Sequence, residues 1–122
     1  MTIEEARNII RDNYECKAGS FVYFLHEKDS FSKEQFWNFY DSIACLVRAD
    51  EEKTPELTMQ ITRNYEHILK YFIYHFNPKD EYKMKDFPEN FNGYLERLDY
   101  ILSAYHNSYD ELLDDSFFEL QR

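Results

Sequence analysis

The sequence predicts an all-α protein, a compact single-domain bundle of five or six helices over residues 1–122. Glycine and proline are scarce, with 2 and 3 residues, whereas β-sandwiches and barrels need many tight turns. Apolar residues make up 43% of the chain and recur at spacings of three and four, the period of an amphipathic helix. Aromatic side chains are abundant, with 11 Phe, 11 Tyr and 1 Trp, and a few of them can fill a small core.

The N-terminal part of the chain contains two apolar segments. The first is expected to be a helix from about Ile3 to Asn13, because Thr2 and Glu5 have the spacing of a capping box. The second, Phe21–Leu25, fits either one or two buried helical turns or a single β-strand. Helix is favoured because no other segment makes a convincing strand for it to pair with.

Two longer helices follow, and each has a start signal. Ser32 opens a second capping box, ahead of an apolar stripe that runs from Phe36 to Val47. Thr54-Pro55 combines an N-cap residue with proline in the first helical position. The helix that begins there has its buried face from Leu57 to Phe76, and Asn77-Pro78 ends it, because a residue before proline disfavours the helical conformation.

The last third of the chain is expected to hold a loop and two more helices. Residues 79–90 are rich in charge and predict a surface loop. An amphipathic helix follows from Phe91 to Tyr105. Ser108 and Glu111 have the spacing of a third capping box, which predicts a short acidic helix toward Phe117.

The charge balance indicates which partners to expect. The net charge is −10, and a field of this sign repels nucleic acids and anionic lipids but attracts basic proteins. No apolar run reaches the ~20 residues of a membrane span, and the first residues lack the basic and apolar regions of a secretory signal. We therefore expect a cytoplasmic protein with a protein partner, and neither nucleic acid nor a membrane as ligand.

Residues able to perform catalysis or hold a metal form no recognised motif. There is no HExxH pattern, and no glutamate precedes a histidine by three residues. His67 and His75 are eight residues apart, too far to share one metal ion, and an enzyme that uses either is only the third hypothesis. Cys16 and Cys45 fit no zinc-ligand spacing and are expected to be free thiols. We therefore expect no enzyme, no catalytic residue, no cofactor and no metal.

The C-terminal segment is the candidate partner-binding surface. Carboxylates beside exposed tyrosines, with Phe117 and Phe118 nearby, offer a basic protein both long-range attraction and rigid anchors. The alternative interpretation is a solvated, capped helix end, which we also favour for the acidic corner Asp50–Glu52. The aromatic excess would also suit a homodimer surface. The candidate residues are Tyr105, Tyr109, Asp110, Glu111, Asp114, Asp115 and Glu119.

A pattern between residues 19 and 37 resembles the N-terminal region of all-helical immunity proteins from bacterial polymorphic toxin systems, including contact-dependent growth inhibition. The residues that carry the resemblance are Ser20, Phe21, Phe31, Glu34, Phe36 and Trp37. The resemblance implies a protein that binds and neutralises a cognate toxin domain, often a basic nuclease, by direct contact. We interpret these six residues as mainly structural. The alternative function is a small acidic helical adaptor or regulator that binds another cytoplasmic protein.

Overall fold

The computed structural model describes residues 1–122 and contains helices without any sheet. A single bridge between Ser30 and Lys85 is the only β-type pairing, so the predicted all-α bundle is confirmed. None of the helices combines the length and the apolar character needed to cross a membrane. The elements are α1 (Ile3–Tyr14), α2 (Phe21–Glu27), α3 (Lys33–Arg48), α4 (Pro55–Phe76) and α5 (Phe91–Asn107), followed by two short 3-10 helices, η1 (Asp110–Leu113) and η2 (Asp115–Phe117).

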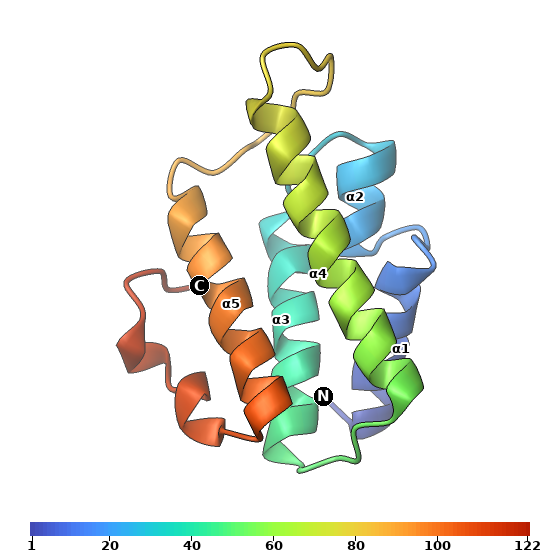
Figure 1. The fold of residues 1–122 in the computed structure, drawn as a ribbon, viewed down its shortest axis with the longest axis vertical. Coiled ribbons are helices and arrows are strands. Elements are labelled where there is room, and N and C mark those ends of the chain that lie inside the picture. Colours follow the sequence, from blue (N-terminus) through green and yellow to red (C-terminus); the bar gives the residue numbers. More distant parts are fainter.

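Helix α3 lies at the centre of the bundle. Helices α1 and α5 pack on it, while α4 packs mainly on α1 and α2. Figure 1 shows α4 at the front and α5 beside it, with α3 visible between and behind them. The C-terminal segment from Asp110 to Arg122 runs along α5.

Hydroxyl side chains cap the starts of the first four helices. In each case the oxygen accepts a hydrogen bond from the amide three residues further on, which satisfies a donor that the helix leaves free. Three of the caps are the ones predicted from the sequence, and Ser20 adds a fourth. The N-cap residues and their donors are Thr2 with Glu5, Ser20 with Tyr23, Ser32 with Gln35, and Thr54 with Leu57.

The ambiguous segment Phe21–Leu25 is helical and forms most of α2. Phe21 and Leu25 are fully buried, and the amide of Val22 donates to the side chain of Asn13 at the end of α1. The choice of helix over strand is thus confirmed. Its physical basis is that a lone strand would have left its backbone groups without partners.

The core is mostly aromatic where α2, α3, α4 and α5 meet. Phe31 lies at its centre, with ring centroids 5.2 Å from Phe21 and 4.9 Å from Tyr94. Phe36 is 4.8 Å from the same tyrosine, edge to face. These rings are 3% exposed or less, so edge-to-face packing fills the interior as the composition predicted.

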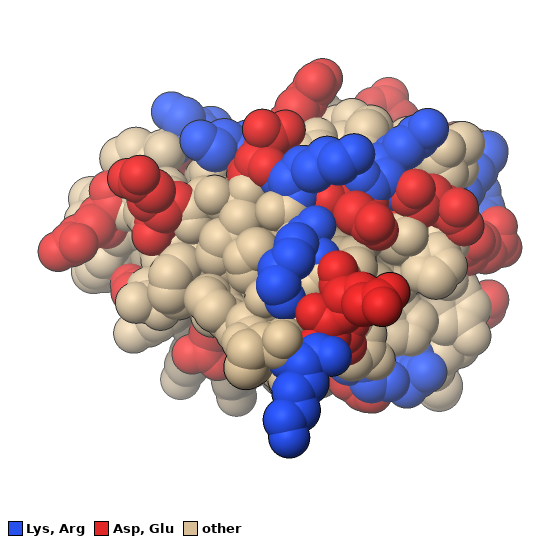
Figure 2. All heavy atoms as spheres, turned by 90° about the horizontal axis from the view of Figure 1, so that it is seen from above, with Lys and Arg blue, Asp and Glu red and all other residues tan.

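The charged segment 79–90 is a loop, as predicted, but it is pinned to the bundle. Lys85 exchanges two backbone hydrogen bonds with the turn after α2, at 2.6 Å to Asp29 and 2.9 Å from Phe31. Met84 is 5% exposed and joins the core. Figure 2 views the molecule from the end that carries this loop, where basic and acidic side chains are interleaved instead of forming a patch of one sign.

One prediction about the C-terminal end is wrong. Ser108 does not cap a new helix: it ends α5 in the left-handed conformation, with φ 57°. Its hydroxyl accepts a hydrogen bond from the ammonium group of Lys53 at 2.6 Å. The residues that follow form 3-10 turns instead of an α-helix.

This difference between the two serines can be tested by alanine substitution. Ser32→Ala should lower the free energy of unfolding by about 1 kcal/mol, because it removes the cap of α3. Ser108→Ala should cost less than about 0.5 kcal/mol, since its side chain makes only an exposed contact. Urea denaturation of both variants measures the two losses. Equal losses would contradict the assignment of the caps.

Candidate functional site: the C-terminal segment and its anchor

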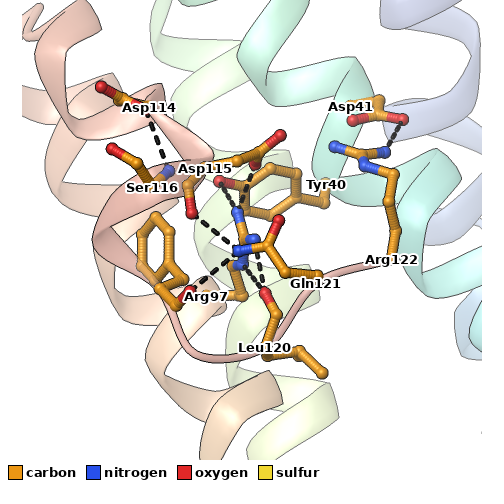
Figure 3. Close-up of polar contacts among 10 residues, drawn as sticks. Tyr40, Asp41, Arg97, Asp114, Asp115, Ser116, Leu120, Gln121 and Arg122 are labelled. Carbon is orange, nitrogen blue, oxygen red and sulfur yellow. Dashed lines mark hydrogen bonds and ion pairs between the residues drawn. The ribbon is translucent and has the colours of Figure 1, made fainter.

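A buried arginine on α5 holds the C-terminal segment in place. Arg97 is 0% exposed. Its guanidinium donates through Nε and Nη2 to the carbonyl oxygen of Leu120, at 3.1 and 2.5 Å. Nη1 donates to Asp115 Oδ1 at 2.7 Å and to the Tyr40 hydroxyl at 3.3 Å. Figure 3 shows these groups converging on the guanidinium from α3 and from the C-terminal segment.

Aromatic rings enclose the same guanidinium. Its carbon lies 4.0 Å from the centroid of Phe118, 5.1 Å from Trp37 and 5.5 Å from Tyr40. The faces of aromatic rings attract cations, and the attraction grows when water is excluded. Hydrogen bonds and rings together replace the water that Arg97 loses on burial.

The close approach of the segment depends on a glycine. A Cβ atom at Gly93 would lie 2.9 Å from Cβ of Leu120, closer than two carbon atoms that are not bonded to each other approach in proteins. The missing side chain thus leaves the space in which Leu120 packs against the first turn of α5. Leu120 is 8% exposed and belongs to the core.

The chain end has a second attachment to α3. Arg122 donates to a carboxylate oxygen of Asp41 at 2.6 Å, and its guanidinium lies 4.6 Å from the centroid of Trp37. The hydrogen bond to Asp41 is the main reason that the pKa of Arg122 is raised. Trp37 thus contacts two arginines, one buried and one at the surface.

Three of the predicted partner-binding residues serve the fold. Tyr105 is 3% exposed and shares a hydrogen bond of 2.8 Å with Thr58, so its side chain lies in the core and not on the surface. Asp115 pairs with Arg97. Asp114 accepts from the amide of Ser116 at 2.9 Å, and this bond lowers the pKa of the carboxyl.

The other four candidates are exposed and make no side-chain hydrogen bond. Tyr109 is 56% exposed, and the carboxylates of Asp110, Glu111 and Glu119 face solvent. Phe117, which lies near these residues in the sequence, is 64% exposed. We call these five residues the tail surface. It keeps the combination of acids and aromatic rings that the sequence suggested, on a segment that Arg97 holds at Asp115, Phe118 and Leu120.

The six residues of the N-terminal pattern have structural roles that agree with their interpretation. Ser20 caps α2, the three phenylalanines are buried in the core, and Glu34 is exposed in the first turn of α3. Trp37 has the additional role described above, as a ring that contacts both Arg97 and Arg122. Sequence reasoning missed this role because nothing along the chain pairs that ring with residues 60 or more positions away.

The acidic corner and the two cysteines also contribute to the structure. In the acidic corner, Glu51 forms an ion pair with Arg7. Cys16 and Cys45 are free and half-buried, and burial is the main reason that the pKa of the Cys16 thiol is raised. No three His, Cys, Asp or Glu side chains come together as a group that could hold a metal.

His75 fixes the 79–90 loop. Its Nδ1 accepts a hydrogen bond from the amide of Met84 at 2.9 Å, and its ring stacks on Phe87 with centroids 4.0 Å apart. Partial burial, and then the charge of Lys83, lower the pKa of His75. Because Nδ1 must be unprotonated to accept this hydrogen bond, the neutral ring holds the loop. His67 is also partly buried, and desolvation lowers its pKa.

No known protein family, characterised protein or solved structure matches this chain. The resemblance to immunity proteins therefore rests on the residues of the N-terminal pattern and stays a prediction.

Removal of the Arg97 guanidinium should release the C-terminal segment. Arg97→Met keeps most of the side-chain volume but leaves the Leu120 carbonyl and the Tyr40 hydroxyl without their donor, a loss of about 2–3 kcal/mol. Amide hydrogen exchange of residues 113–121 should become faster than in the unmodified protein, by a larger factor than exchange in α3. The control is Arg63→Met, which breaks only an exposed pair with Glu66 and should cost at most about 0.5 kcal/mol. Unchanged exchange in the segment would contradict the role of Arg97 as its anchor.

The folded protein should lose stability when the pH falls below the ordinary histidine pKa of 6.5. The folded-state pKa of His75 is lower, so the unfolded chain binds the proton first as the pH falls. The free energy of unfolding therefore decreases as the pH falls from the ordinary histidine pKa toward the folded-state pKa of His75. The His75→Asn variant offers an acceptor that does not titrate, and its stability should depend less steeply on pH. Urea titrations between pH 7.5 and 5 in steps of about half a unit measure both slopes. Identical slopes would exclude His75 as a source.

Proposed function

We propose that this chain is an immunity protein, which binds and neutralises a cognate bacterial toxin domain by direct protein–protein contact. A basic domain, such as a nuclease, is the class of toxin that its charge favours. The observation that carries the proposal is the tail surface, where Tyr109 and Phe117 are more than half exposed beside three carboxylates that have no partner within the chain.

The physical argument concerns both rate and affinity. Carboxylates that are free of internal ion pairs attract a basic partner over several ångströms and raise the association rate. Large aromatic rings on a segment held in place supply contact area without much loss of side-chain entropy. The net charge of −10 adds to the attraction. The N-terminal pattern, from Ser20 to Trp37, supports the narrower proposal of toxin neutralisation through its resemblance to immunity proteins.

Co-expression tests the proposed function. The chain should restore growth to cells that produce the toxin domain encoded directly upstream of it, and the two proteins should co-purify as a stable complex. Growth arrest that persists with both proteins present, together with failure to co-purify, would exclude toxin neutralisation and leave an acidic helical adaptor as the alternative.

Charge reversal on the tail surface should slow association with that toxin domain. Asp110→Lys with Glu111→Lys removes two carboxylates that do not take part in anchoring the segment, and we expect about a tenfold lower association rate at low salt. Asp114 and Asp115 are unsuitable for this test because they have structural contacts. Stopped-flow measurements at two salt concentrations report the rate.

The matched control for this variant is Glu15→Lys with Glu89→Lys. Both residues are exposed, and the pair produces the same change of net charge on other parts of the molecule. The control should slow association less than the tail variant does. Equal rates for the two variants would mean that the overall charge, and not the tail surface, attracts the toxin.

A further inference from the structure

A pocket of about 280 Å³ lies between α1 and the start of α4. Figure 1 shows these two segments side by side, away from the C-terminal segment. Small-molecule sites begin at roughly 300 Å³ and are mostly apolar, whereas Leu57 is the one apolar residue in the lining of this pocket. Its size and its lining therefore suit a small polar ligand. The lining residues are Arg7 and Arg11 on α1, and Thr54, Glu56, Leu57 and Gln60 at the start of α4.

The side chain of Gln60 has no partner within the chain. Gln60 is 8% exposed and lies on the buried face of α4, one turn before Asn64. The side chain of Asn64 donates to the Ile10 carbonyl at 3.0 Å, but the amide of Gln60 makes no such hydrogen bond. Its polar atoms are not sealed in the core, because Asn64 Oδ1 is the one fully buried side-chain atom without a partner. The amide of Gln60 thus offers both a donor and an acceptor to a ligand in the pocket that it lines.

Two opposite charges line the same pocket without pairing with each other. The charge of Arg7 is compensated by Glu51 at 2.5 Å. The guanidinium of Arg11 donates to the neutral side chain of Asn8 at 2.7 Å, and neither Arg11 nor Glu56 forms an ion pair. An anion in the pocket would be repelled by Glu56, and a cation would be repelled by Arg11. A ligand that carries both charges is attracted by both residues.

We propose that this pocket binds a free α-amino acid, with the carboxylate of the ligand on Arg11, its ammonium group on Glu56, and the amide of Gln60 hydrogen-bonded to it. A guanidinium suits a carboxylate because it can donate two parallel hydrogen bonds. An ammonium group is a donor without acceptors, which a glutamate carboxylate accepts. The site is separate from the tail surface and goes beyond the proposed neutralisation of a toxin.

Nuclear magnetic resonance of the isotope-labelled whole protein tests the site. The common L-amino acids are added one at a time up to about 10 mM, enough to saturate a site with a millimolar Kd. At least one should shift the side-chain amide signals of Gln60. Two derivatives of the amino acid that binds best are the matched probes, since its N-acetyl form keeps only the carboxylate and its amide form keeps only the ammonium group. Each should bind at least about tenfold more weakly, because it loses a charge-assisted hydrogen bond.

Variants locate the binding on the protein, with the backbone amide of Leu57 as the reporter. Gln60→Leu keeps the side-chain volume and should weaken binding of the free amino acid about tenfold. Arg11→Gln should abolish its preference over the amide form, and Glu56→Gln its preference over the N-acetyl form. Both residues are exposed, so these two variants test the site even where Gln60→Leu does not fold.

The control variant is Lys28→Gln. It changes the net charge as Arg11→Gln does, at an exposed residue that does not line the pocket, and it should bind like the unmodified protein.

Three results would overturn the proposal. The first is the absence of any shift at Gln60 with all the amino acids. The second is binding of the N-acetyl form as tight as that of the free amino acid, which would define an anion site. The third is binding that Arg11→Gln and Glu56→Gln both leave unchanged. None of these measurements uses a toxin domain, so their outcome is independent of the rescue experiment.

Discussion

The hydrogen bonds and ring contacts of Arg97 are the interaction on which the C-terminal segment after α5 depends. A guanidinium that is removed from water costs several kcal/mol unless its donors and its charge are satisfied. The Leu120 carbonyl, Asp115 and Tyr40 provide acceptors, and Trp37 and Phe118 provide ring faces. Because these groups come from α3 and from the chain end, the arginine on α5 joins three parts of the structure.

This anchor decides which acidic residues can meet a partner. Asp115 has its charge compensated within the molecule, and Asp114 shapes the turn before Ser116. Asp110 and Glu111 stay free in η1. A stretch of acids that looks uniform in the sequence thus contains both structural and available carboxylates, and only the second kind can attract a ligand.

Helix α5 separates the tail surface from the exposed apolar side chains of α4. On one side lies the C-terminal segment with the tail surface. The segment packs on α5 through the contact of Phe118 with Tyr100, whose ring centroids are 5.4 Å apart. On the other side lie the exposed side chains of Ile73 and Phe76. Since the one basic residue of α5 is buried, the helix between the two surfaces exposes only carboxylates.

The sequence by itself determined the helical class and most helix boundaries. Those features depend on local rules: the period of apolar residues, hydroxyl caps such as Ser32, and proline at the start of α4. The structure of the C-terminal segment and the functions of its side chains were decided by tertiary contacts. Ser108 has the spacing of a cap, yet its hydroxyl accepts a hydrogen bond from Lys53. Further on, Arg97 holds the chain at Asp115 and Leu120, and no local pattern reveals the burial of this arginine. Contacts between residues far apart in the chain overrode a local preference there, because a single capping hydrogen bond contributes only about 1 kcal/mol.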